Sequence, residues 1–256
     1  MSATLIDWHC HLDRAGGVQA LDRPDPGLKN ADGPLVFAVT NRPAHWQRLH
    51  QLNHARLLWG LGLHPGERDS PRDLAQMLEL LDMSDAVGEI GLDGAAGKAA
   101  LNSQRTALER ILSHPALGSR VVSIHSRRAV PAILEHLDEH HLPGAVLHWF
   151  TGTPAQTARA SAIGAWFSVN ASMARSAALP EIPHDRLLLE TDAPYSRAKT
   201  PGQLSGVLAV ISSTWKLPVD ECAAIVQCNQ MALLAATPDT AAALKRMASW
   251  REGTRR

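Results

Sequence analysis

The sequence predicts an α/β fold, a single (β/α)8 TIM barrel that spans residues 1–256 and carries extra helices at its C-terminus. The length of 256 residues is close to the roughly 250 residues that such a barrel needs. Short apolar runs alternate with amphipathic ones along most of the chain, which is the pattern of repeated βα units. The apolar runs are nearly continuous, as in strands buried on both faces of a parallel sheet. An open doubly wound sheet is the alternative.

Eight segments rich in Val, Ile, Leu and Trp are the expected strands. They cover residues 4–12, 34–41, 57–63, 85–93, 121–126, 144–150, 165–170 and 186–194. Amphipathic segments between most of them predict helices over residues 43–55, 71–82, 102–114, 128–141 and 153–164. From about residue 200 the chain is predicted to be helical throughout, with helices over 204–216, 218–236 and 240–250.

The composition indicates a soluble, cytoplasmic protein. The formal net charge is zero, so no overall basic field indicates a nucleic-acid partner. The three cysteines, Cys10, Cys222 and Cys228, form no CxxC pair, which fits a reducing compartment. No basic run precedes an apolar segment at the N-terminus, and no apolar stretch approaches the roughly 20 residues that cross a bilayer. We therefore expect no membrane partner.

The first strand carries an unusual alternation, "TLIDWHCHLD". A period of two places Asp7, His9 and His11 on one face, so that Trp8 and Cys10 are expected to face the helices. In a barrel the polar face would point into the interior. Burying a carboxylate and two imidazoles costs several kcal/mol unless a partner compensates them, and a metal cation is the usual partner.

Other strands end on similar side chains, at the edge where barrel enzymes build their sites. Four imidazoles and two carboxylates form the candidate ligand set: His9, His11, Glu89, His125, His148 and Asp192. Six ligands are too many for one tetrahedral ion, but they suit two ions about 3.5–4 Å apart that share a carboxylate. The mixed nitrogen and oxygen set fits Zn, Mn, Fe or Ni, and fits Mg less well.

Six motifs, in order and spacing, resemble those of the TatD family of metal-dependent deoxyribonucleases. They are "DWHCHLD", "GLHPGE", "VGEIGLD", "SIHSRRA", "VLHWFTGT" and "LLLETDAPYS", from about Asp7 to Tyr195. The resemblance implies an amidohydrolase-like barrel, hydrolysis of phosphodiester bonds in DNA, and often 3′-to-5′ exonuclease action. The same motifs look like a divergent branch, the TatD-type nuclease subunit of Qat anti-phage defence systems, which implies a role in defence and other Qat proteins as partners.

The resemblance also implies roles for single residues. Two divalent ions (Zn, Mn, Mg or Ni) would be bound, with Glu89 as the bridge between them. The first ion would take His9, His11, Glu89 and Asp192, and the second Glu89, His125 and His148. His64 matches a family position near the scissile phosphate. The chain departs from the family at Gly66, where a His is common, at Gly94, where an aromatic is common, and after "TDAPY". The substrate rim is therefore altered while the ligand set is intact.

These residues predict hydrolysis by a water that two metal ions activate, with Asp192 orienting that water and accepting its proton. His64 is expected to contact the phosphate or assist the leaving group. Arg127 follows the fifth strand and is read equally well as a phosphate contact or as a surface ion pair. Asp7, deeper in the barrel, is interpreted as a residue that does not bind metal itself but hydrogen-bonds to a ligand imidazole and orients it.

Two other functions stay open. One is metal-dependent hydrolysis of another bond, such as an ester, amide or lactone, because many hydrolases share such barrels. Many of those enzymes have a bridging lysine at the end of the fourth strand, whereas Glu89 occupies that strand here. The other is a conditionally active subunit of a defence complex. Outside the site, His136, His140 and His141 in "EHLDEHH" are expected on a solvated helix end rather than at a metal.

Overall fold

The computed structural model describes residues 4–22, 25, 33–52, 54–67 and 70–254. Every strand segment predicted from the sequence contains a strand. The eight strands are β1 Ile6–Cys10, β2 Leu35–Val39, β3 Leu57–Gly60, β4 Val87–Gly91, β5 Val122–His125, β6 Ala145–His148, β7 Trp166–Val169 and β8 Leu187–Leu189. All neighbouring pairs are parallel, which confirms the predicted α/β class.

The strands form two sheets that follow the chain order, β1-β2-β3 and β4-β5-β6-β7-β8. A parallel bridge between Leu61 and Val87 joins the sheets on one side. On the other side the backbone N–H of His11 donates to the carbonyl of Ala193, and that of Asp192 to the carbonyl of His9, both over 2.8 Å. The parallel order and these two junctions agree with the predicted barrel.

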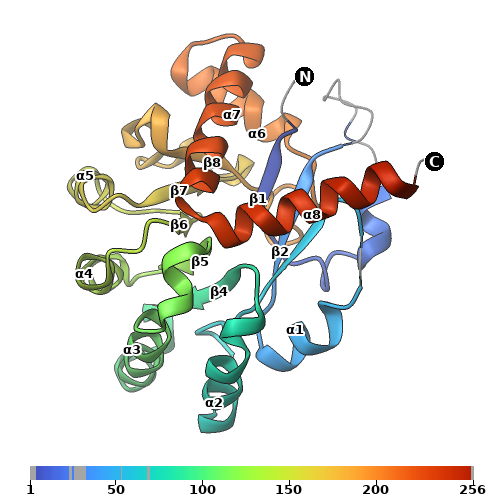
Figure 1. Ribbon diagram of the computed structural model, residues 1–256. Coiled ribbons are helices and arrows are strands. Elements are labelled where there is room, and N and C mark those ends of the chain that lie inside the picture. Colours follow the sequence, from blue (N-terminus) through green and yellow to red (C-terminus); the bar gives the residue numbers. More distant parts are fainter. Residues whose placement is uncertain (1–3, 23–24, 26–32, 53, 68–69, 255–256) are drawn as a thin grey trace.

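Five helices each follow one of the strands β2 to β6, and they surround the strands in Figure 1. They are α1 Pro43–Leu49, α2 Pro71–Leu80, α3 Lys98–Leu112, α4 Val130–His140 and α5 Pro154–Ala162. Helix α1 ends earlier than predicted because the chain has to turn before it enters β3. Pro at the start of a helix costs little there, since its missing N–H would be unpaired in any case.

The C-terminal helices are present as predicted: α6 Ser205–Trp215, α7 Val219–Ala236 and α8 Pro238–Thr254. Figure 1 shows α8 crossing in front of the strands. Thr240 of α8 accepts a hydrogen bond from the backbone N–H of Val121 (3.0 Å) and donates to the carbonyl of Asp85 (2.7 Å). Both partners lie where β5 and β4 begin, so α8 covers the amino ends of the strands. The opposite, carboxyl ends stay open for a site.

We expect Thr240→Val to destabilise the protein by about 1–3 kcal/mol, because valine keeps the shape but removes the partner of the buried N–H of Val121 and of the partly buried carbonyl of Asp85. The hydroxyl of Thr240 is fully buried, so water cannot replace it. Urea unfolding of the two proteins measures the difference. Thr106→Val is the matched control, since that exposed hydroxyl bonds only to a carbonyl of its own helix. Equal losses for both variants would contradict the role given to α8.

The interior of the strand arrangement is apolar towards the amino ends. Phe37, Val39, Val146, Trp166 and Leu188 pack there together with Leu244 of α8. Trp8 also belongs to this cluster, so the expectation that it faces the helices is wrong. The register of β1 against β2 shifts between Asp7 and Cys10. Such an irregularity breaks the alternation of side chains, and Trp8 and His9 both enter the interior.

No helix in the described part of the chain is long and apolar enough to cross a membrane.

Candidate metal centre

The predicted ligands converge at the carboxyl ends of the strands. His9, Glu89, His125 and His148 lie within strands, His11 follows β1 directly, and Asp192 lies in the segment just after β8. All of them except His9 line a pocket of ≈ 780 Å³. All six are buried or nearly so: His9 is fully buried, and the side chain of His125 is 14% exposed. The structure therefore brings the whole candidate ligand set together.

One half of the cluster is built from His9, His11 and Asp192 around one oxygen of Glu89. The two imidazole Nε2 atoms lie 3.3 Å apart, and they lie 3.7 and 3.6 Å from Oδ1 of Asp192. Oε2 of Glu89 lies 3.6 Å from His9 Nε2 and 3.3 Å from His11 Nε2. Four ligands about 2.1 Å from a tetrahedral zinc ion would lie roughly 3.4 Å apart. These four atoms are spaced like the ligands of one ion.

The other half gathers around the second oxygen of Glu89. Oε1 lies 2.7 Å from Nδ1 of His125 and 2.8 Å from Nε2 of His148, and these two nitrogens lie 3.3 Å apart. Nε2 of His64 approaches the same oxygen to 3.4 Å, and Oδ2 of Asp93 lies 3.4 Å from the far nitrogen of His125. The two oxygens of Glu89 thus face two different sets of imidazoles.

The donor atoms of this cluster fit a cation. Nδ1 of His11 donates to the amide oxygen of Asn41 over 2.9 Å, which leaves a lone pair on the Nε2 atom that faces the carboxylates. Nδ1 of His9 lies 2.7 Å from the hydroxyl of Ser123. Among the described residues, Oε2 of Glu89 and Oδ1 of Asp192 are buried without a hydrogen-bond partner. Buried oxygens of this kind are costly unless a cation compensates them.

The electrostatics of the cluster depend on burial and on mutual charge. Burial opposes ionisation of Glu89, yet the nearby imidazoles of His148 and His64 hold the pKa of its carboxyl well below the ordinary value. Burial raises the pKa of Asp192 to about 7, although His148 acts in the opposite direction. A carboxyl held this far from its ordinary pKa is typical of functional sites. A nearby cation would favour the ionised form of Asp192.

Asp7 is placed differently from the expectation. Its carboxylate accepts hydrogen bonds from the backbone N–H and the hydroxyl of Thr191 (2.8 and 2.6 Å) and from the N–H of Gly202 (2.8 Å). In the described chain no imidazole contacts this carboxylate, and His9 offers it only its backbone N–H, over 3.4 Å. The carboxylate fixes the position of the segment that carries Asp192. Asp7 therefore supports a ligand carboxylate and not a ligand imidazole.

Sequence reasoning missed the residues that support the imidazoles, which are Asn41, Ser123 and Glu190. Glu190 is fully buried and accepts hydrogen bonds from Ser168 and from Asn170 (2.8 Å), and it lies 3.8 Å from Nδ1 of His148. Two of them have positions in the sequence that point to the site: Asn41 stands at the end of the predicted strand segment "FAVTN", and Glu190 stands just before the motif "TDAP". Ser123 lies two residues before His125 and gives no signal in the sequence.

We expect Asn41→Ala to weaken metal binding by about 10–100-fold, because the partner that fixes the ring and tautomer of His11 is removed. Titration with a competing chelator measures the affinity. Gln47→Ala is the control: it also removes an amide, but from an exposed pair with Gln76. Unchanged metal affinity in Asn41→Ala would show that the orientation of His11 does not depend on this bond.

The rim of the pocket carries His64, Arg127, Arg128, Trp149 and Tyr195. The side chain of His64 is 19% exposed and accepts a hydrogen bond at Nδ1 from the N–H of Gly66 (2.8 Å). Arg127 lines the pocket and also lies 3.8 Å from Asp93. Its position is therefore compatible both with a phosphate contact and with a surface ion pair. Arg128 and Trp149 have positive φ angles of 52° and 40°. Such strained backbone gathers at functional sites.

A parallel α/β fold with a buried His/Glu/Asp cluster at the carboxyl ends of its strands defines a metal-dependent hydrolase. The family model described as "TatD related DNase" matches residues 6–235. The chain therefore belongs to the TatD family.

Several relatives agree with this assignment. The chain is 30% identical over 249 residues to the "Uncharacterized metal-dependent hydrolase YjjV" of Escherichia coli, which covers 87% of this chain and 95% of that protein. It is 33% identical to the "3'-5' ssDNA/RNA exonuclease TatD" of Edwardsiella piscicida, over 63% of this chain and 68% of that one. The crystal structure of YjjV superposes with a TM-score of 0.73 at 27% identity and covers 91% of this chain and 98% of its own.

Proposed function

We propose that this chain hydrolyses phosphodiester bonds in DNA at a centre of two divalent metal ions. The observation that carries the proposal is the position of Glu89, whose two oxygens each face a separate set of buried ligands. His9, His11 and Asp192 would share one ion with Glu89, and His125 and His148 the other. Two such ions neutralise phosphoryl oxygens and lower the pKa of a bound water.

The side chains of this site have separate tasks in the proposed reaction. Asp192 lies 3.6–3.7 Å from both imidazoles of the first half-site, where its carboxylate orients the attacking water and accepts its proton. His64 lies between the second half-site and the open pocket, where Nε2 contacts the phosphate or the leaving oxygen. Arg127 is 63% exposed at the rim and adds a charge-assisted contact to an incoming phosphate.

DNA is the proposed substrate because relatives of this chain carry names for that activity. Besides the Edwardsiella piscicida exonuclease, the human protein "Deoxyribonuclease TATDN3" is 28% identical over 74% of this chain. A phosphodiester also matches the site, since its charge needs cations and an arginine contact. We further propose that residues 1–256 work as a single hydrolase domain. All three cysteines carry free thiols, which supports action in the reducing cytoplasm.

We also propose that the protein acts in anti-phage defence as the nuclease subunit of a Qat-type system, with other Qat proteins as partners. The motif resemblance supports this role, and so does the altered rim. A side chain at Gly66 would meet the ring of His64 at 2.9 Å, so the histidine common in the family could not be added here without moving His64. Phage plating on cells that express the system with wild-type chain or Glu89→Gln tests the role. Equal protection by both would contradict it.

Metal reconstitution tests the enzymatic part of the proposal. The purified chain is stripped with chelator and then supplied with Mg, Mn, Zn or Ni together with single- or double-stranded DNA labelled at either end. We expect no cleavage in chelator and recovery with at least one of these ions. The position of the label shows the direction of degradation. Cleavage that persists in chelator would contradict the proposal. So would hydrolysis of an ester or amide under conditions in which no ion restores DNA cleavage.

A further inference from the structure

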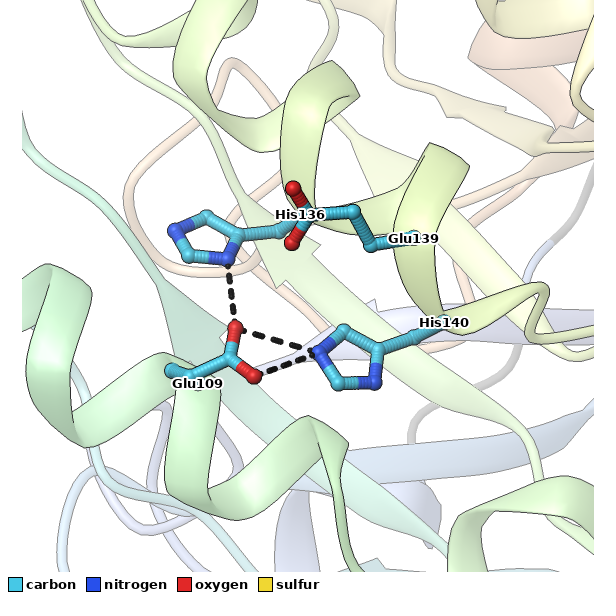
Figure 2. A group of neighbouring side chains, drawn as sticks. All are labelled: Glu109, His136, Glu139 and His140. Atoms are coloured by element: carbon cyan, nitrogen blue, oxygen red, sulfur yellow. Dashed lines mark hydrogen bonds and ion pairs between the residues drawn. The ribbon is translucent and has the colours of Figure 1, made fainter.

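A second group of metal-binding side chains lies outside the pocket, between α3 and α4. His136, Glu139 and His140 come from the end of α4, and Glu109 comes from the end of α3. Figure 2 shows Glu109 between the two imidazoles. One oxygen of Glu109 lies 3.0 Å from Nδ1 of His136, and both oxygens lie 3.1 Å from Nε2 of His140.

The spacing of these residues places them on one face of the helix. Side chains three and four positions apart on a helix are neighbours, so His136, Glu139 and His140 form a ready three-residue set. One donor atom from each of them and one from Glu109 all lie within 4.8 Å of one another. Four ligands of a tetrahedral zinc ion lie roughly 3.4 Å apart, so small movements of these side chains would bring all four donor atoms around one ion.

The two histidines are not on a solvated face, contrary to the expectation from the sequence. Their side chains are only 12% and 16% exposed, while Glu109 is 44% exposed. The sequence places them at the polar end of α4, and the packing of α3 against that end covers them. They are therefore held in place, whereas the carboxylates stay accessible to an ion from solvent.

The charges of these four residues favour a site with a bound cation over an empty site. The carboxylates of Glu109 and Glu139 approach each other within the 4.8 Å that encloses the group, and like charges so close repel. All four residues lie in the last two turns of α3 or α4, where the partial negative charge of a helix C-terminus attracts cations.

We propose that Glu109, His136, Glu139 and His140 bind one divalent transition-metal ion of the zinc class, which joins α3 to α4. Two imidazole nitrogens and two carboxylate oxygens are ligands that zinc accepts in tetrahedral sites. The strands that follow α3 and α4, β5 and β6, begin close to these helix ends. The site therefore lies towards the amino ends of the strands, away from the catalytic pocket at their carboxyl ends. Its role is to hold two helices together rather than to take part in hydrolysis.

Zinc content measured on the full chain tests the proposal. Wild type, His140→Gln and Glu109→Gln are stripped, dialysed against a series of buffered free-zinc concentrations, and analysed for bound zinc per chain. We expect both variants to bind one zinc ion fewer than wild type, or to bind that ion at least about tenfold more weakly. The zinc-induced rise in melting temperature is expected to be smaller in both variants, because a ligand that binds only the folded state stabilises it.

His141→Asn is the matched control, because His141 is an exposed histidine next to the site and asparagine tolerates its left-handed backbone (φ 48°). This control is expected to bind as much zinc as wild type. Far-ultraviolet circular dichroism checks that each variant is folded, and Glu109→Gln retains a side chain of the same size. Equal zinc content in wild type and in both folded variants throughout the series would overturn the proposal. Nuclease activity is not the readout, so this result is independent of the proposed function.

Discussion

Glu89→Gln is expected to lower the rate of DNA hydrolysis by about 10³-fold, a loss at the upper end of those seen when one stabilising group is removed from an active site. The amide has nearly the same shape, but it is uncharged and presents an NH₂ group to one of the two ligand sets. Glu89 contacts five imidazoles through its two oxygens. No other described carboxylate is in this position, so the loss cannot be compensated locally.

The rate is measured on labelled single-stranded DNA at a metal concentration that saturates wild type, and bound metal is measured on the same samples. We expect the variant to lose metal together with activity, which distinguishes a ligand from a residue that only contacts substrate. Glu135→Gln is the control, since this glutamate on α4 is 54% exposed and pairs with Arg105. A Glu89→Gln variant that keeps its metal and its activity would rule out the bridging role.

The sequence predicts much of this architecture because the governing patterns are local. Continuous apolar runs mark the eight strands, and each strand is too short to be mistaken for a long helix. Parallel strands bring their carboxyl ends to the same edge, so a ligand at the end of each strand has to approach the others. His125 and His148 are predicted in this way, and the structure places their nitrogens 3.3 Å apart.

The sequence fails where a strand departs from regular alternation. The register shifts between Asp7 and Cys10 in β1, and again between Val87 and Ile90 in β4. Both shifts enclose predicted metal ligands, His9 and Glu89. Irregularities of this kind are common beside active sites, where they re-aim a side chain. A strict period of two cannot reveal them, which explains why it places Asp7 and Trp8 on the wrong faces.

Contacts between distant parts of the chain are the other source of error. The histidines at the end of α4 look solvated in the sequence because nothing there shows that Glu109 of α3 lies against them. The support of His9 by Ser123 has the same origin, since the two residues are 114 positions apart. Such pairs arise from the packing of the fold, and no local pattern predicts them.

Trp8→Ala is expected to destabilise the protein by about 3–5 kcal/mol, the usual loss when a buried tryptophan is truncated to alanine. Trp8 is 1% exposed and packs among Phe37, Val39 and Val146 below the metal ligands. The neighbours belong to several strands, so the cavity cannot collapse without moving the strands that carry His9 and His148. Urea unfolding in the presence of chelator measures the loss, because bound metal would otherwise add its own stabilisation.

Trp215→Ala is the matched control, since Trp215 is only partly buried and stacks on His184 at the end of α6. We expect it to lose clearly less stability than Trp8→Ala, and to keep the metal affinity of wild type. Trp8→Ala should also bind metal more weakly, because the strand that holds His9 and His11 loses its packing on the apolar side. A loss no greater than that of Trp215→Ala would contradict the tight packing of Trp8 in the apolar interior.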